Sequence, residues 1–164
     1  LLAGLLAFCQ AALLLVLHPP MALAAAGVEP AGHCTPISEA QVAQLFDRWN
    51  SALASGDADR VVELYSSDAL LLPTLSTEPR QTPAAIRDYF LGFLARAPQA
   101  RIDSRTIRVG CDSALDAGTY SFRVGDPAAP AAGRQWVRAR YSFVYAPVHG
   151  EWRIIHHHSS LQPS

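Results

Sequence analysis

The sequence has no excess of charge of either sign. Its 164 residues carry 13 Lys and Arg against 14 Asp and Glu, which gives a formal net charge of −1 at pH 7. A protein that holds nucleic acid through a basic surface needs a clear excess of Lys and Arg, and an acidic disordered tail needs the reverse. The composition therefore argues against both classes, and we expect no nucleic-acid partner.

The sequence also lacks the common cofactor motifs. It contains no dinucleotide fingerprint, no flavin motif and no metal triad. The run His156-His157-His158 comes nearest to a metal site, but neighbouring strand residues point to opposite faces, so at most two of the three could share one ion. Zinc sites usually take three or four protein ligands. We therefore predict no cofactor and no metal, and expect these histidines to pack, or to orient a ligand or transfer a proton.

Residues 1–26 are predicted to be a secretory signal. Residues 1–17 form one apolar run interrupted only by Gln10, and residues 21–26 offer small side chains for cleavage. The alternative is an uncleaved membrane anchor, although the run is shorter than the roughly 20 apolar residues of a spanning helix. We expect cleavage, export to the periplasm, a lumen or the extracellular space, and no stable membrane span afterwards.

Cleavage would leave two cysteines, Cys34 and Cys111, in an exported chain. An even pair in that setting predicts a disulfide, worth about 4 kcal/mol in the chain-entropy model. The alternative is two buried free thiols. We expect residues 27–36 to be a linker and residues 37–164 to form one domain.

Apolar residues recur at helical spacing in three segments of the first half. The first helix is expected from the N-cap Ser38 to Gly56. A short second helix is expected at residues 58–65, and a third begins at Thr82-Pro83, with Thr as the cap and Pro as the first helical residue.

The apolar period changes to two in the second half. Strands are predicted at residues 69–72, 101–109, 118–124, 135–146 and 151–159, and the last two form a hairpin. Helices that precede a run of hairpin strands predict an α+β fold, in which a curved, cone-shaped antiparallel sheet packs on the three helices. We expect a cavity between the sheet and the helices.

Six segments carry a family resemblance. They are residues 46–50 (FDRWN), 65–74 (YSSDALLLPT), 86–90 (IRDYF), 102–105 (IDSR), 138–145 (RARYSFVY) and 152–160 (WRIIHHHSS). They resemble the nuclear transport factor 2-like (SnoaL-like) superfamily, and within it the branch of the SgcJ/EcaC proteins and the calcium/calmodulin-dependent protein kinase II association domain. The ending W-x-x-x-H-x-H-x-S is the most specific part.

The resemblance implies the same fold and leaves the function open. Members of the superfamily include an oligomerisation hub for kinases, small-molecule binders, and cyclases, isomerases and dehydratases. This sequence has no Gly-rich nucleotide loop, H-R-D or D-F-G, so it cannot itself phosphorylate. We expect an exported association or small-ligand-binding domain that forms a homodimer or larger oligomer. The alternative is an enzyme of the SnoaL or SgcJ/EcaC type.

The resemblance also implies a pocket inside the cone. It places Ile155, His157 and Ser159 on the inner side of the last strand. The pocket would be completed by the aromatic residues Trp49, Tyr65, Tyr89, Tyr120, Phe122 and Phe143. Such a pocket suits a small apolar or aromatic ligand, although the same aromatics would also serve as core.

Catalysis would need a proton acceptor in that pocket. In the enzyme alternative His157 is the general base and Tyr141 or Tyr120 polarises the substrate. No carboxylate alternates inward on the last two predicted strands, which leaves an Asp103–His157 pair as a conjecture. We expect an inward carboxylate or phenol bonded to His157 if the protein is an enzyme, and a wall of aromatics around it if it is a binder.

The opposite face of the sheet is predicted to hold Arg138, Arg140, His156 and His158. The resemblance favours polar contacts with a second subunit at this face. The alternative is an anion site, since Arg and His side chains suit a carboxylate or phosphate.

Overall fold

The structure, a computed structural model, describes residues 34–126 and 128–163, so the predicted signal and most of the predicted linker lie outside the described residues. Its elements in chain order are α1 (Glu39–Ser55), α2 (Ala58–Val62), β1 (Tyr65–Leu72), α3 (Pro83–Leu94), β2 (Gln99–Val109), β3 (Ala114–Val124), a short 3-10 turn η1 (Pro130–Ala132), β4 (Gln135–Val148) and β5 (Glu151–Leu161). Within this part of the chain no helix is both long and apolar enough to cross a membrane.

The helix boundaries follow from local capping chemistry. The Ser38 hydroxyl accepts a hydrogen bond from the Gln41 backbone N–H at 3.2 Å, and the Gln41 side chain accepts one from the Ser38 N–H at 2.8 Å. Gly56 ends α1 in the left-handed conformation at φ 72°, which glycine adopts without strain. Thr82 caps α3 through the N–H of Ala85. The predicted N-cap Ser38 and the predicted starts of these two helices are confirmed.

The second helix is shorter than expected. It ends at Val62, and the chain enters β1 at Tyr65 instead of continuing as helix to that residue. The cause is pairing with a segment distant in sequence, since Ile154 of β5 donates its N–H to the carbonyl of Leu64 at 2.9 Å. Because β1 runs parallel to β5, the sheet is mixed, while its other pairs are antiparallel as predicted.

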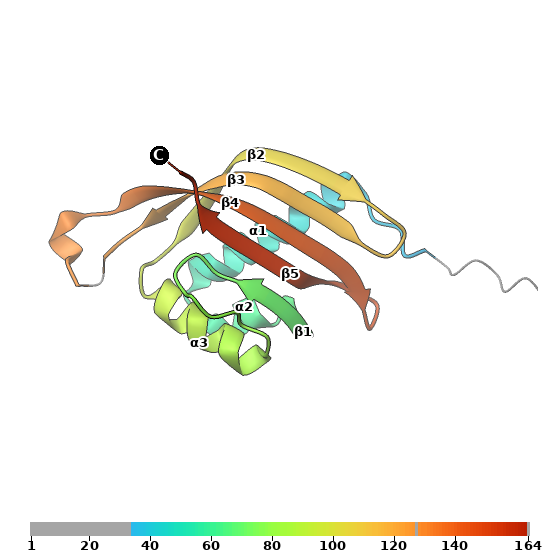
Figure 1. The fold of residues 1–164 in the computed structure, drawn as a ribbon, viewed down its shortest axis with the longest axis horizontal. Coiled ribbons are helices and arrows are strands. Elements are labelled where there is room, and N and C mark those ends of the chain that lie inside the picture. Colours follow the sequence, from blue (N-terminus) through green and yellow to red (C-terminus); the bar gives the residue numbers. More distant parts are fainter. Residues whose placement is uncertain (1–33, 127, 164) are drawn as a thin grey trace, which may run out of the picture. The chain divides into compact units, whose positions relative to one another are not determined.

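The five strands form one curved, unclosed sheet in the order β1-β5-β4-β3-β2, with the three helices gathered on one side of it (Figure 1). The fold is α+β, as expected. Its inner face and the helices bury an aromatic core, whose largest members are Trp49, Tyr120, Tyr145, Phe46, Phe90 and Phe143.

Two bulges, one in β5 and one in β2, determine which side chains of these two strands face the helices. In β5 the register passes from Val144 opposite His156 to Tyr145 opposite Ile154, so Ile155 is an extra residue. Ile154 and His157 are therefore both buried, at 2% and 3% exposure. Ile155 does not take the inward place expected for it, because strict alternation fails at the bulge.

The second bulge is at Asp103 in β2, between the pairs that Ile102 and Ser104 make with β3. It turns Arg105 toward the helices. Beside it β2 approaches β3 so closely that a Cβ at Gly118 would lie 2.0 Å from the Ser104 carbonyl oxygen. Glycine is required there because no other residue leaves that space empty.

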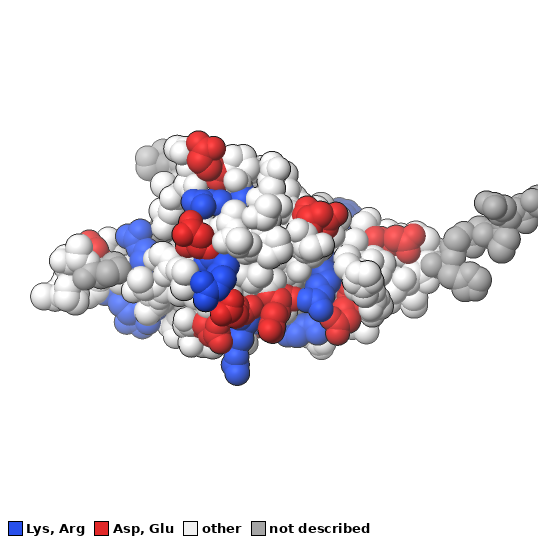
Figure 2. Space-filling view, turned by 90° about the horizontal axis from the view of Figure 1, so that it is seen from below, with Lys and Arg blue, Asp and Glu red and all other residues white. Residues whose placement is uncertain are grey.

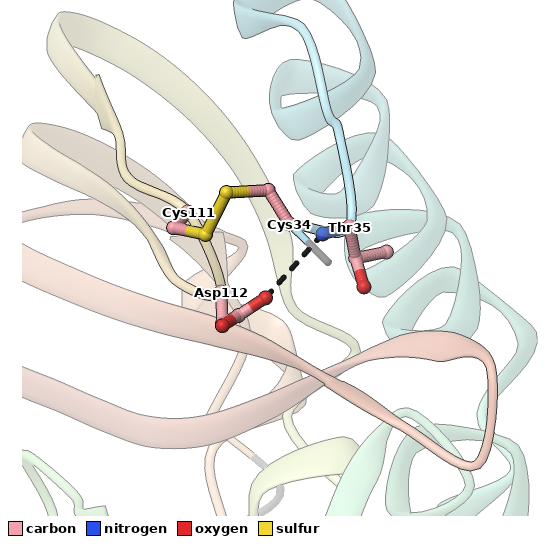
Figure 3. The surroundings of a disulfide bond; sticks show 4 residues. All are labelled: Cys34, Thr35, Cys111 and Asp112. Carbon is pink, nitrogen blue, oxygen red and sulfur yellow. Dashed lines mark hydrogen bonds between the residues drawn. A yellow bond between two sulfur atoms is a disulfide. The ribbon is translucent and has the colours of Figure 1, made fainter. Parts of the chain in front are cut away.

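Cys34 and Cys111 form a disulfide that links the segment before α1 to the turn between β2 and β3 (Figure 3). The Thr35 backbone N–H also donates to the Asp112 carboxylate at 3.3 Å. The predicted cysteine pairing is therefore present in the structure.

Candidate functional site

A cavity of about 260 Å³ lies on the helix side of the sheet, between α3 and strands β3, β4 and β5. Its walls are largely apolar. The lining residues are Trp49, Leu71, Pro73, Thr74, Leu75, Tyr89, Phe90, Phe93, Arg96, Tyr120, Phe122, Val124, Val137, Ala139, His157, Ser159 and Leu161. This lining contains no Asp or Glu, so a carboxylate base is absent from it.

His157 is a deeply buried titratable group of this lining, at 3% exposure. Its ring stacks on Phe143 with centroids 4.0 Å apart and meets the Trp49 ring edge-on at 5.3 Å. Burial, together with a smaller contribution from charge repulsion by His156 and His158, lowers the pKa of His157 to about 3. The imidazole is therefore neutral at physiological pH.

A hydrogen-bonded chain leads from α1 to this imidazole. Trp49 donates its indole N–H to the Tyr65 hydroxyl oxygen at 3.1 Å, and that hydroxyl lies 2.8 Å from His157 Nδ1. Burial raises the pKa of Tyr65 well above its ordinary value, which keeps the phenol protonated. All three groups of the chain are thus neutral.

Three hydroxyl groups form a second polar position in the cavity wall. Tyr120 donates to Ser159 Oγ at 2.6 Å, and Ser159 Oγ lies 2.6 Å from Thr74 Oγ1. Burial raises the pKa of the Tyr120 phenol, so it is a donor and not a phenolate. These hydrogen bonds link the segment after β1 to β5 and reach from β5 past β4 to Tyr120 of β3.

A buried carboxylate that sequence reasoning missed lies further along the inner face. Asp116 of β3 is fully buried and accepts hydrogen bonds from Arg105 Nε at 3.1 Å and the Tyr141 hydroxyl at 2.8 Å. Arg105 Nη2 is 3.1 Å from the other carboxylate oxygen without hydrogen-bond alignment. Burial raises the pKa of Asp116, whereas the Tyr141 hydrogen bond and the Arg105 charge lower it.

This carboxylate is not a partner for His157. The two residues flank Phe143 in the strand register, and the Phe143 ring stacks on the imidazole. Asp103 is no partner either, because its carboxylate accepts from Ser121 at 2.5 Å and from Arg101. The conjectured Asp103–His157 pair is therefore not formed.

The cavity brings together only part of the predicted site. Trp49, Tyr89, Tyr120, Phe122 and His157 line it. The side chains of Tyr65, Phe143 and Tyr141 lie in the core behind the lining, and Tyr141 uses its hydroxyl on Asp116. In the described residues, no three His, Cys, Asp or Glu side chains gather as a metal site would require.

The four residues predicted on the outer face do lie there, but they are spread along it. His156 lies opposite Val144, and Arg140 lies opposite Ser160. Beyond the end of β5, the Arg138 carbonyl accepts a hydrogen bond from the Gln162 backbone N–H. The six residue steps from Arg138 to Val144 span about 20 Å of strand. The four side chains therefore do not converge on one anion.

The sequence model of the calcium/calmodulin dependent protein kinase II association domain matches residues 38–163. The chain belongs to this family. A solved association-domain structure from Xanthomonas campestris is 45% identical, and the match covers 78% of this chain and 91% of that one with a TM-score of 0.72. The resemblance of the sequence to this family is thereby confirmed.

More distant structures share the fold alone. A nuclear transport factor 2-like protein from Streptomyces avermitilis, described as a candidate dehydratase, is 15% identical with a TM-score of 0.67 over 76% of this chain and 97% of its own. An epoxide hydrolase/cyclase-like enzyme of salinomycin pyran ring formation is 17% identical with a TM-score of 0.58 over 76% and 93%. Both association domains and proteins with enzyme names therefore use this architecture.

Proposed function

We propose that this association domain pairs with a second copy of itself through the outer face of its sheet. The observation that carries the proposal is the unequal cover of the two faces: the helices pack on the inner face, and none of the described elements packs on the outer one. The centre of the outer face is half-buried and rich in apolar groups, with Leu70, Leu72, Leu115 and Val144 beside His156 and His158. A face of this composition is typical of subunit contacts.

The helix side makes a poorer partner surface. Figure 2, which views the molecule from below, shows acidic and basic side chains intermingled on that side. Many of them are already paired, as Arg87 is with Asp59 at 2.6 Å and Arg80 with Asp88 at 3.0 Å. Charged residues are depleted at the centre of protein interfaces.

Native mass spectrometry of Val144→Glu tests the proposal. We expect the unchanged protein to have the mass of two or more copies at micromolar concentration. The variant should associate at least about 100-fold more weakly, because it buries an unpaired carboxylate at the contact. Ala84→Glu, which adds the same charge on exposed α3, is the control and should keep the assembly. A monomeric unchanged protein, or an intact assembly of Val144→Glu, would contradict the proposal.

We also propose that the cavity binds a small apolar or aromatic molecule. The support is a concave space with apolar walls and few polar groups, which is the usual form of a ligand site. The enzyme alternative finds mixed support. His157 is hydrogen-bonded to the Tyr65 phenol, as expected for catalysis. Its ring is also packed against Trp49 and Phe143, as expected for binding. If Tyr65 donates to His157 Nδ1, the imidazole has no free lone pair with which to act as a base, and this favours binding.

Export remains our proposal for the location of the domain. The disulfide between Cys34 and Cys111 supports it, because structural disulfides persist mainly in oxidising compartments.

A further inference from the structure

We infer that the cavity selects neutral, largely apolar molecules that carry a hydrogen-bond acceptor such as a carbonyl oxygen, which takes the Nε2–H of His157. The inference rests on the proposed ligand binding and specifies the class of ligand. It also assigns His157 the role of donor in place of the general base that the enzyme alternative gives it.

The tautomer of His157 is assigned from the hydrogen-bond network. An indole N–H can only donate, so the Tyr65 oxygen accepts from Trp49. If Tyr65 donates its own proton to His157 Nδ1, only the Nε2–H remains without a partner. With the opposite tautomer both the Tyr65 O–H and the Nε2 lone pair are left unpaired. The first arrangement satisfies more buried groups, and therefore Nε2 carries the proton.

Nε2 is the ring nitrogen of His157 that is left for a ligand. The ring's other nitrogen is bound to Tyr65, which does not line the cavity, whereas His157 does. Nε2 is buried and has no hydrogen-bond partner among the described residues, and it is the one such atom there that belongs to a lining residue. A buried donor without a partner costs free energy, which an incoming acceptor recovers.

The neutral state of His157 favours a neutral ligand at this position. Arg96 is the one charged residue of the lining, and its Nε donates to the Gly125 carbonyl at 3.4 Å, outside the hydrogen-bonded chain of Trp49, Tyr65 and His157. A carboxylate placed at neutral His157 would lose its hydration, and the imidazole itself supplies no positive charge in return. A carbonyl oxygen loses less water and accepts the same hydrogen bond.

The size of the cavity limits the ligand to one aromatic ring with a short substituent. Its volume of about 260 Å³ lies below the usual range for sites that hold drug-sized molecules. The flanking rings of Trp49, Tyr89 and Phe93 offer edges and faces to such a ring.

Three probes of nearly equal size test this inference: acetophenone, isopropylbenzene and benzoate. They have the same number of non-hydrogen atoms and differ in the acceptor and the charge. We expect calorimetric titration of the purified protein to give acetophenone about tenfold tighter binding than isopropylbenzene, because only the ketone satisfies the Nε2–H. Benzoate should bind more weakly than acetophenone.

Each of the other outcomes contradicts a different step of this inference. Equal or tighter binding of isopropylbenzene would leave the ligand site standing and reject the donor role of His157. Tighter binding of benzoate would reject neutrality and point to Arg96. Binding of none of the three would reject the ligand-binding function together with this inference.

Variants of the histidines locate the effect. His157→Phe should abolish the preference for acetophenone over isopropylbenzene, and His157→Gln, which keeps an N–H donor, should retain part of it. His156→Gln changes a neighbouring histidine on the outer face and is the matched control, which should keep the full preference. An undiminished preference in His157→Phe would overturn the inference, and the comparison of probes in the unchanged protein stands even if that variant fails to fold.

Discussion

Replacing Arg105 by Met is expected to lower the free energy of unfolding by about 3–5 kcal/mol, because it leaves the carboxylate of Asp116 charged and without its cation in the core. Asp116 is fully buried, and Tyr141 alone would remain as its hydrogen-bond donor. The variant also removes the guanidinium that lies 5.2 Å from the centre of the Phe46 ring. Urea denaturation at neutral pH measures the loss.

The matched control is Arg87→Met, which breaks an ion pair with Asp59 on the exposed surface and should change the stability little. Adding Asp116→Asn to Arg105→Met should recover part of the loss, since the amide carries no charge and its oxygen still accepts from Tyr141. The sign of the pH dependence is a further check. Without Arg105 the folded state raises the pKa of Asp116, so the penalty should shrink as the pH falls and the carboxyl becomes protonated. An equal loss in both Arg variants would contradict this account.

Loss of the disulfide is expected to lower the free energy of unfolding by about 4 kcal/mol. Cys34 and Cys111 are 77 residues apart in sequence, so the bond restricts a long stretch of the unfolded chain. Denaturation with and without reductant measures the effect. The double variant Cys34→Ala, Cys111→Ala should be equally destabilised and should not respond to reductant. Two titrating thiols in the denatured protein without reductant would contradict the bond itself.

Features encoded by neighbouring residues were predictable from the sequence. The ends of α1 and the start of α3 depend on Ser38, Gly56 and Thr82, whose side chains or conformations act within one helical turn. Features that depend on pairing across the sheet were not. The strand character of Tyr65 comes from β5, and the extra residues at Asp103 and Ile155 appear only in the register of their partner strands.

The candidate site was likewise predictable only in part. The inward position of His157 followed from the family resemblance, and its aromatic surroundings from the sequence pattern. Asp116 was missed because β3 was expected to begin at Gly118. Asp116 is separated by steps of two from Ala114, Gly118 and Tyr120, and this spacing would have placed it on the same face of the strand as Tyr120. The order of the hydrogen bonds from Trp49 through Tyr65 to His157 joins three distant segments, so no local pattern reveals it.

The protonation state of His157 tests the account of the cavity most directly. Nitrogen NMR of labelled protein distinguishes a protonated ring nitrogen from an unprotonated one, and can be followed as the pH is lowered. Because burial lowers the pKa of His157 to about 3, we expect a neutral ring with the proton on Nε2 from neutral pH down to about pH 4. A proton on Nδ1, or an imidazolium that forms near pH 6.5, would contradict the assignment of His157 as the donor of the cavity.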